Sequence, residues 1–337
     1  MSRAVHVVAR AGVDDPHTLG VLALADALGA RAPVLASEGA VWVDGVEPIG
    51  ALPPAHVPVV YHALDAAPRL VQLLIDRAGP TVVVDGGAPL DPLARRDLRA
   101  LADAGAAAVA TSAGGIARLG EAGFGHATRL PPVVARDRLR AVRAFAPTAH
   151  HLDVAVPGPL VVCLDELATA ADAARAVQAY HVLRTYLRRA ANFVVGVLGT
   201  STTLDTAVRR VAREIWGLRL ADAWLQRVSS PGERAALTRP AAAIVTTAPA
   251  AGDVRGALAA MAEGVPVIAP SDASAAEVLR DGALVLPAGA GAPLIAEAIA
   301  EVLANDDRRA ALVARADAVI ADYEPARVAS AWAAVLA

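Results

Sequence analysis

Short runs of apolar, mostly β-branched residues alternate with alanine-rich amphipathic segments along nearly the whole chain. In the first half, the runs that predict buried strands are Val5–Val8, Val57–Tyr61, Thr81–Val84 and Ala107–Ala110. The segments that predict helices between them are Thr18–Leu28, Pro68–Arg77 and Leu93–Ala104. Val41–Val46 predicts a small hairpin with an Asp-Gly turn. The alternation is typical of βαβ units and therefore predicts an α/β fold with a mostly parallel sheet.

The alternation stops at residues 146–159, which hold three prolines and no helical period, and then resumes. Such a break is typical of an interdomain linker. The later predicted strands are Leu160–Leu164, Asn192–Leu198, Ala223–Leu225, Ala243–Val245, Pro266–Ala269 and Ala283–Leu286. The later predicted helices are Ala170–Arg189, Asp205–Trp216, Pro293–Leu303, Arg308–Ile320 and Pro325–Leu336. Two doubly wound domains are predicted, residues 1–156 and 157–324, with a last helix at 325–337 and a ligand cleft at the carboxyl ends of the strands.

The composition excludes several classes of protein. The apolar runs fall short of the roughly 20 residues that a membrane-spanning helix needs. The N-terminal segment predicts a buried strand rather than a signal peptide. Cys163 is the one cysteine, which excludes an internal disulfide and favours the cytoplasm. A formal net charge of −3 gives no general attraction to nucleic acid.

The chain contains no lysine, so its 31 lysine-plus-arginine residues are all arginines. A phosphate-binding Walker lysine, a Schiff-base lysine and a lysine general base are therefore excluded. His150, His151 and Asp153 lie close together, but without a cysteine pair or a helical histidine spacing they favour a solvated hinge over a metal site. We expect neither a metal nor another cofactor.

The segment Ala241–Pro287 carries the motif that most narrows the function. Ala260–Val267 reads Ala-Met-Ala-Glu-Gly-Val-Pro-Val, and this resembles a turn in the nucleotide-sugar domain of retaining GT-B glycosyltransferases of family 4. Further stretches that resemble this family are Val60–His62, Glu121–Phe124, Val177–Leu183, Ala191–Gly196, Leu225–Ser229 and Glu233–Leu237. The resemblance implies an acceptor-side domain, a nucleotide-sugar domain and a last helix that returns to the first domain.

The chain departs from this family at the positions that bind the sugar donor. The Arg and Lys that hold the donor diphosphate in the family fall on Glu166 and Ala171. The two carboxylates of its Glu-x7-Glu motif fall on Ala251 and Ala259, and an acceptor-domain histidine falls on Asp85. Losing two charge-assisted hydrogen bonds to the diphosphate would weaken binding of the sugar donor by roughly 3–6 kcal/mol, a factor of about 10² to 10⁴ in affinity. Glu166, Ala171 and Ala259 are expected at the cleft edge, where the missing side chains could be restored without unfolding the protein.

The remaining candidates come partly from the resemblance and partly from the residues themselves. Residues expected to line the ligand cleft are His62, Gly199, Thr200, Gly252, Arg255 and Glu277. Asp85 and Asp14 are candidate catalytic groups, although the position of Asp14 favours capping of the helix that follows it. The arginine-rich stretch 129–143 favours a solvated helix face over contact with anionic lipid.

These departures favour a degenerate glycosyltransferase-like protein. It would act as a ligand-binding module, or as the non-catalytic partner of an active glycosyltransferase, in a cytoplasmic glycan or natural-product pathway. The alternative is an active retaining hexosyltransferase that takes a nucleotide sugar or another activated donor at a non-standard site. In that case Arg255 or Arg227 would replace the diphosphate clamp, and Asp85 or Asp14 would supply the polar catalytic group.

Overall fold

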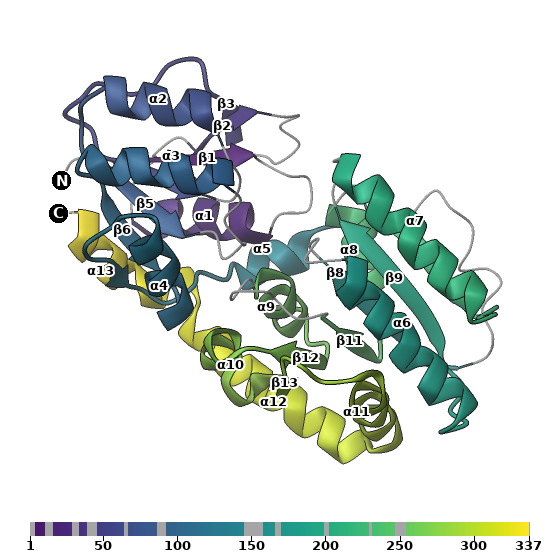
Figure 1. Cartoon of the computed structure of the whole chain (residues 1–337). Coiled ribbons are helices and arrows are strands. Elements are labelled where there is room, and N and C mark those ends of the chain that lie inside the picture. Colours follow the sequence, from purple (N-terminus) through teal and green to yellow (C-terminus); the bar gives the residue numbers. More distant parts are fainter. Residues whose placement is uncertain are drawn as a thin grey trace. The chain divides into compact units, whose positions relative to one another are not determined.

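The computed structural model describes residues 4–10, 16–28, 34–38, 46–63, 67–85, 92–144, 158–165, 170–198, 202–228, 231–246 and 254–336. The chain divides into two compact units (Figure 1). The first consists of Met1–Ala135 with Asp322–Ala337, and the second of Arg136–Ala250 with Val254–Ala321. Most of the expected linker, residues 146–157, lies outside the described residues.

The first unit is built on a parallel sheet with the strand order β3-β2-β1-β4-β5-β6-β7. Its strands are β1 (Val5–Arg10), β2 (Val34–Glu38), β3 (Val46–Pro48), β4 (Val59–Ala63), β5 (Thr81–Asp85), β6 (Ala107–Ala110) and β7 (Thr128–Arg129). Its helices are α1 (Pro16–Ala27), α2 (Pro68–Asp76), α3 (Pro92–Asp103), α4 (Ala113–Glu121) and α13 (Pro325–Leu336). The order reverses between β1 and β4, which is the signature of a doubly wound Rossmann-like domain.

The predicted strands and helices of this unit are confirmed, but three short strands carry no sequence signal. β2, β3 and β7 read Val-Leu-Ala-Ser-Glu, Val-Glu-Pro and Thr-Arg, so they lack the run of apolar β-branched residues that marks the predicted strands. Of the predicted hairpin Val41–Val46, only Val46 lies within the described residues, and it begins β3, which pairs with β2 in parallel.

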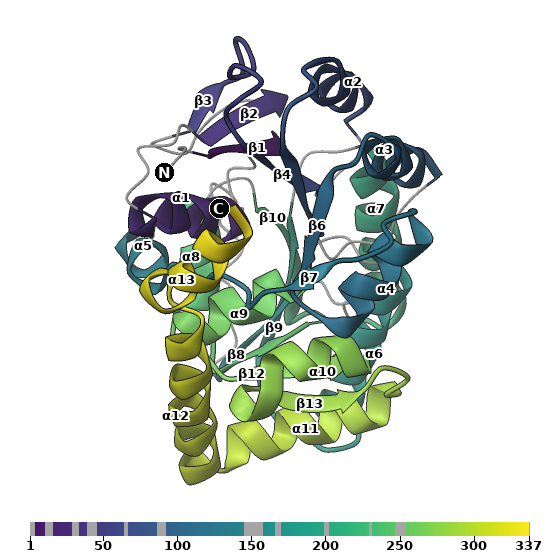
Figure 2. The same cartoon turned by 90° about the vertical axis from the view of Figure 1, so that its left-hand side faces the viewer.

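Both faces of the first sheet are covered because successive residues of a strand point to opposite sides. On one face, Tyr61 and Val83 pack with Leu70 of α2 and Leu101 of α3. The other face has its own core cluster, whose members include Ala4, Leu24, Val60, Val82, Val84, Val109, Val328 and Trp332. Helix α13 lies beside α1 on this second face (Figure 2), and the Trp332 side chain is only 2% exposed.

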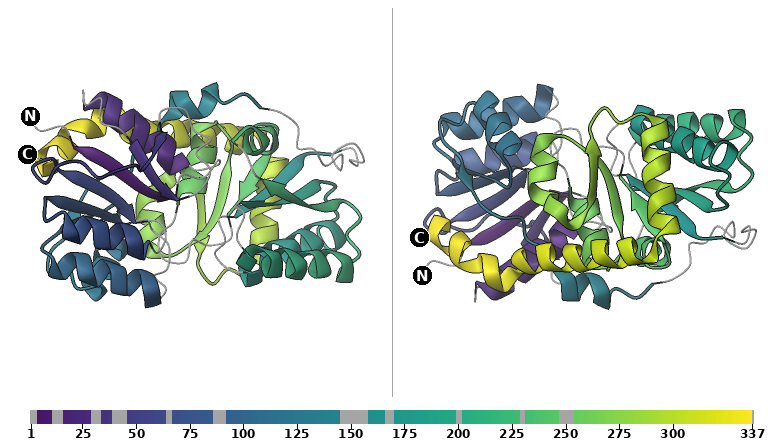
Figure 3. Two further views of the ribbon diagram at one scale, coloured as in Figure 1. Left: turned by 90° about the horizontal axis from the view of Figure 1, so that it is seen from above. Right: turned by 90° about the horizontal axis from the view of Figure 1, so that it is seen from below.

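The second unit contains a parallel sheet with the order β10-β9-β8-β11-β12-β13. Its strands are β8 (Leu160–Asp165), β9 (Asn192–Leu198), β10 (Ala223–Val228), β11 (Ala243–Val245), β12 (Val267–Ser271) and β13 (Leu284–Pro287). Its helices are α5 (Arg136–Ala141), α6 (Ala170–Thr185), α7 (Thr202–Gly217), α8 (Pro231–Thr238), α9 (Arg255–Ala262), α10 (Ala273–Leu279), α11 (Ala292–Ala304) and α12 (Asp306–Asp322), with a short 3-10 turn η2 (Arg280–Gly282). The strand order again reverses once, between β8 and β11, so the predicted α/β class with two doubly wound domains is confirmed (Figure 3).

Tyr180, a buried tyrosine of α6, joins this helix to β9 and to the residue that precedes β10. The Tyr180 ring stacks on Phe193 with 4.7 Å between ring centroids. Its hydroxyl donates to Asp222 Oδ2 at 2.7 Å and also contacts the Ala191 carbonyl oxygen. Burial is the main reason why the pKa of Tyr180 is raised, so the phenol keeps the proton that it donates. Arg184 pairs with the other oxygen of Asp222 and neutralises this buried carboxylate.

The packing of α1 depends on Gly20. A Cβ added at Gly20 would lie 2.7 Å from the carbonyl oxygen of Val133, a backbone atom that cannot rotate away. We expect Gly20→Ala to lower the free energy of unfolding by about 1–3 kcal/mol, because the overlap outweighs the better helix propensity of alanine. Denaturant unfolding followed by circular dichroism measures this change.

Gly120→Ala in α4 is the matched control, because a Cβ there would meet nothing within 4 Å. It should leave stability unchanged or raise it by about 0.5–1 kcal/mol. Equal stability of the two variants would contradict the close approach of α1 to Val133.

Candidate ligand site

The carboxyl edge of the second sheet is the place where a doubly wound fold presents a ligand site. Helix α9 begins here at Arg255, after β11, and α10 begins at Ala273, after β12. Asp272 caps α10, since its Oδ1 accepts a hydrogen bond from the Ala275 amide at 2.8 Å. Val254 precedes α9 and has no side-chain group that could cap it. The first turn of α9 therefore directs backbone N–H groups and the positive end of the helix dipole toward this edge.

Two hydroxyl groups lie on neighbouring strands at the same edge. Thr246 directly follows β11, and Ser271 is the last residue of β12; both are buried. Val245 is paired with Ile268, so Thr246 and Ser271 point to the same face of the sheet. Within the described part of the chain, neither Thr246 Oγ1 nor Ser271 Oγ has a hydrogen-bond partner. Buried hydroxyls almost always have partners, so these two atoms suit a polar ligand.

Helix α9 packs closely against the second sheet. All residues from Ala257 to Ala262 are buried, and Ala259 is 1% exposed. The expectation that Ala259 lies at an accessible cleft edge is therefore wrong. The reason is that α9 is buried along most of its length and packs directly on its neighbours, which leaves no room beside the Ala259 methyl group.

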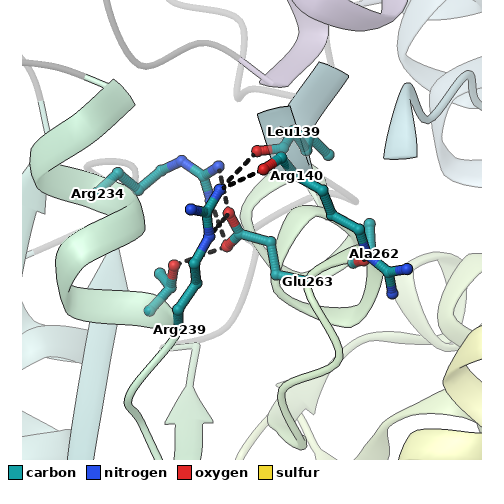
Figure 4. A network of polar contacts seen from close by, with 7 residues as sticks. Leu139, Arg140, Arg234, Arg239, Ala262 and Glu263 are labelled. Atoms are coloured by element: carbon teal, nitrogen blue, oxygen red, sulfur yellow. Dashed lines mark hydrogen bonds and ion pairs between the residues drawn. The ribbon is translucent and has the colours of Figure 1, made fainter. Parts of the chain in front are cut away.

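A buried carboxylate at the end of α9 holds this helix in place (Figure 4). Glu263 follows the last residue of α9, and its side chain is 1% exposed. Each of its oxygens lies 3.3 Å from a guanidinium nitrogen of Arg234 in α8. Thr238 donates a further hydrogen bond to Glu263 Oε2 at 2.6 Å. The Glu263 charge is thus neutralised by a paired arginine and a hydroxyl of α8, as a buried carboxylate requires.

The same cluster reaches α5. Arg239 Nε lies 3.6 Å from Glu263 Oε1, while its Nη2 donates to the carbonyl oxygens of Leu139 at 2.9 Å and Arg140 at 3.2 Å. Arg140 in turn donates from Nε to the Ala262 carbonyl oxygen at 2.9 Å. Helices α5, α8 and α9 are joined through these contacts, and the position of the α9 N-terminus follows from them.

In the first unit, Asp85 ends β5 and pairs with Arg118 of α4. Arg118 Nη2 lies 2.5 Å from Asp85 Oδ2, and Arg118 Nε lies 3.3 Å from Oδ1, in a pair whose side chains are nearly buried. Asp85 also touches the start of α4, where a Cβ added at Gly115 would lie 2.6 Å from its Oδ2. Both carboxylate oxygens are therefore engaged by α4. This geometry suits a structural ion pair better than the catalytic role expected of Asp85.

His62 is also engaged within the first unit. It lies in β4 and is buried, and its Nε2 is 3.2 Å from Nδ1 of the buried His6 in β1. The two rings stack with centroids 5.5 Å apart. A hydrogen bond between two imidazoles needs one donor and one acceptor, so at least one ring of this pair is neutral.

The other predicted site residues are placed as follows. Arg255 is the first residue of α9 and Glu277 lies in α10, and both are half-buried near the carboxyl edge of the second sheet. Ala171 lies in the first turn of α6. Residues outside the described part of the chain are Asp14, Glu166, Gly199, Thr200, Ala251 and Gly252. Sequence reasoning missed Arg118, Arg234 and Glu263, because their pairing partners are 29 or 33 residues away.

The described residues hold no group of three or more His, Cys, Asp or Glu side chains arranged to bind a metal ion. Among the helices that the structure describes, none is both long enough and apolar enough to cross a membrane.

If Asp85 is structural, Asp85→Asn should lower the free energy of unfolding by about 3–5 kcal/mol, because it leaves the nearly buried Arg118 without its countercharge. Glu121→Gln is the control, since Glu121 pairs with Arg95 at 3.6 Å with both side chains more than half exposed. That change should cost no more than about 1 kcal/mol. Urea unfolding compares the stability of the two variants. Equal unfolding midpoints would show that the pair with Arg118 is not structural, and Asp85 would remain a catalytic candidate.

No protein-family model matches the sequence, and no curated protein matches it either. Solved structures match it over the full length. An α,α-trehalose-phosphate synthase from Burkholderia xenovorans, in complex with glucose-6-phosphate, has a TM-score of 0.75 at 14% identity and covers 99% of this chain and 100% of its own. HepE of Anabaena, in complex with UDP-glucose, has a TM-score of 0.73 at 13% identity, with 99% of each chain covered. A glycosyltransferase from Rickettsia africae has a TM-score of 0.71 at 14% identity, covering 99% of this chain and 98% of its own.

The TM-scores establish the fold. At identities this low, the chemistry has to be argued from the residues of this chain. Both sheets are doubly wound, which agrees with the GT-B architecture implied by the Ala260–Val267 motif. The chain therefore has the two-domain, Rossmann-like fold of the GT-B glycosyltransferases.

Proposed function

We propose that this protein is a degenerate glycosyltransferase that binds an anionic sugar ligand but transfers sugar inefficiently or not at all. It would serve as a ligand-binding module or as the partner of an active glycosyltransferase. The cytoplasm is the proposed location, and the single, buried Cys163 is in keeping with its reducing conditions.

The observation that carries this proposal is the environment of Ala259. The resembled family has a carboxylate here that binds the ribose hydroxyls of the donor. In this chain the position holds a methyl group that is 1% exposed, on a helix buried from Ala257 to Ala262. A carboxylate has been replaced by apolar packing, which removes a charge-assisted hydrogen bond worth about 1.5–3 kcal/mol.

Other features of the same edge support binding of a ligand. The first turn of α9 has no side-chain cap from Val254, and such helix starts attract phosphate groups. The buried hydroxyls of Thr246 and Ser271 could hydrogen-bond to a phosphate or a sugar. HepE was solved with UDP-glucose and the Burkholderia synthase with glucose-6-phosphate, so we propose a nucleotide sugar or a sugar phosphate as the ligand class.

The alternative function is an active retaining glycosyltransferase with a non-standard donor site. Arg255 favours it, because this half-buried residue begins α9 and could supply a positive charge to a diphosphate. A working enzyme of this kind would lose turnover on Arg255→Ala and remain folded.

A panel of UDP-, GDP-, ADP- and dTDP-sugars and of hexose phosphates tests the proposal. We expect a sugar phosphate or nucleotide sugar to raise the melting temperature only at high concentration, as weak binding does. Product assays with the same donors should detect no transfer. Micromolar binding of a nucleotide sugar together with turnover that Arg255→Ala abolishes would establish the alternative. If no compound of the panel binds, the proposal of a ligand-binding module is rejected, and the role as the partner of an active glycosyltransferase remains.

Ala259→Glu tests whether packing has replaced the ribose contact. If Ala259 is buried as described, the variant should lose more than about 3 kcal/mol of stability, because a carboxylate enters an apolar site. Ala311→Glu, on the exposed face of α12, is the control and should change stability by less than about 0.5 kcal/mol. A stable Ala259→Glu variant with tighter binding of a nucleotide sugar would show that this position still opens onto a donor site.

A further inference from the structure

Helix α7 has an unusual exposed face. Its inner side packs on the core of the second unit through Val211, together with Val208 and Ile215. On the opposite side, Arg209, Arg213 and Trp216 follow one another at helical spacings of four and three residues, so they form one stripe. Trp216 is 83% exposed, more than any other large hydrophobic residue that the structure describes.

The charge of this face is predominantly positive. Arg209, Arg210, Arg213 and Arg219 are all exposed. Helix α7 has two acidic residues, Asp205, which lies four residues before Arg209, and Glu214. Glu214 is half-buried and accepts a hydrogen bond from Gln178 of α6 at 2.8 Å, so it is turned toward the neighbouring helix. The four exposed arginines therefore outnumber the one carboxylate, Asp205, whose position in the helix places it on their side of α7.

The end of α6 adds to the same surface. Helices α6 and α7 pack side by side (Figure 1), and each leads back to the start of the next parallel strand. Their last turns therefore lie at the same edge of the sheet, the amino edge. Just after α6, Tyr186 is 72% exposed, and Arg188 and Arg189 are exposed beside it. We call the residues Tyr186, Arg188, Arg189, Arg209, Arg210, Arg213, Trp216 and Arg219 the α6–α7 surface.

We propose that the α6–α7 surface binds an anionic lipid surface. Tryptophan and tyrosine are the residues that favour the boundary between lipid headgroups and hydrocarbon, and arginines pair with lipid phosphates. A protein partner fits less well, because it would have to offer a carboxylate to each arginine that it buries, whereas an anionic lipid surface offers phosphates at every point. Here two large aromatic side chains lie among six arginines.

This inference does not depend on the proposed function. The candidate ligand site lies at the carboxyl edge of the second sheet, whereas the ends of α6 and α7 lie at its amino edge. Variants of the α6–α7 surface should therefore leave the melting-temperature response to sugar phosphates unchanged.

Sedimentation with vesicles tests the proposal. The full chain should bind vesicles of equal parts phosphatidylcholine and phosphatidylglycerol, release them at high salt, and bind pure phosphatidylcholine weakly. Each arginine near an anionic surface contributes about a fivefold change in affinity, so Arg209→Gln with Arg213→Gln should weaken binding roughly 25-fold. Binding should shift the tryptophan emission to shorter wavelength, and Trp216→Ala should abolish that shift.

Arg308→Gln with Arg309→Gln removes the same charge from α12, where Arg308 is exposed and Arg309 is half-buried, and is the control. It should keep nearly all of the binding. All substituted side chains are at least partly exposed, so circular dichroism should show folded proteins throughout. Equal loss in both double variants, no binding to anionic vesicles, or an emission shift that survives Trp216→Ala would overturn the proposal. Preference for a nucleic acid over anionic vesicles at the same salt concentration would overturn it as well.

Discussion

The pairing of Glu263 with Arg234 is the interaction on which the candidate site depends. Both side chains are almost fully buried, and together with Thr238 and Arg239 they connect α9 to α8 and α5. Removing one partner of such a pair leaves an uncompensated charge and costs about 3–5 kcal/mol. The start of α9, where a ligand phosphate would bind, is held in position by a contact at the other end of the same helix.

In both units, arginine is the residue that pairs with buried carboxylates, because the chain has no lysine. Asp85 pairs with Arg118, Asp222 with Arg184, and Glu263 with Arg234. The planar guanidinium offers several N–H donors in a fixed arrangement and can engage both oxygens of a carboxylate. An arginine in this sequence is therefore as much a candidate for the interior as for a ligand site, and the residue type alone does not distinguish the two.

The fold and the donor contacts obey separate constraints. Glycosyltransferases at 10–14% identity share the arrangement of both sheets with this chain, since the arrangement needs only apolar strands, small residues on close helices and suitable turns. A donor site needs particular charged groups at a few positions. At Ala259, which the family resemblance aligns with one of those positions, this chain has a buried methyl group. Loss of such contacts leaves the fold unaffected, which is why a glycosyltransferase fold is compatible with a binding function.

Sequence alone determined where most helices and strands lie. Their alternation along the chain was enough to predict two doubly wound domains. These features arise between neighbours in the chain, where a period of two or of 3.6 residues places apolar side chains on one face. The strands β2, β3 and β7 were not predicted because their residues do not form an apolar β-branched run.

Tertiary structure decided which polar and apolar groups meet. Asp85 ends a strand at the edge where catalytic groups are found, yet Arg118, 33 residues later, engages both of its oxygens. Ala259 matches a ligand-binding position in the family motif, yet it packs into the interior, while Trp216 is exposed. Pattern assigns a residue to a helix or strand, but its neighbours come from other elements. The order of the strands in the sheet decides which elements come into contact, and the local periodicity of the sequence does not predict that order.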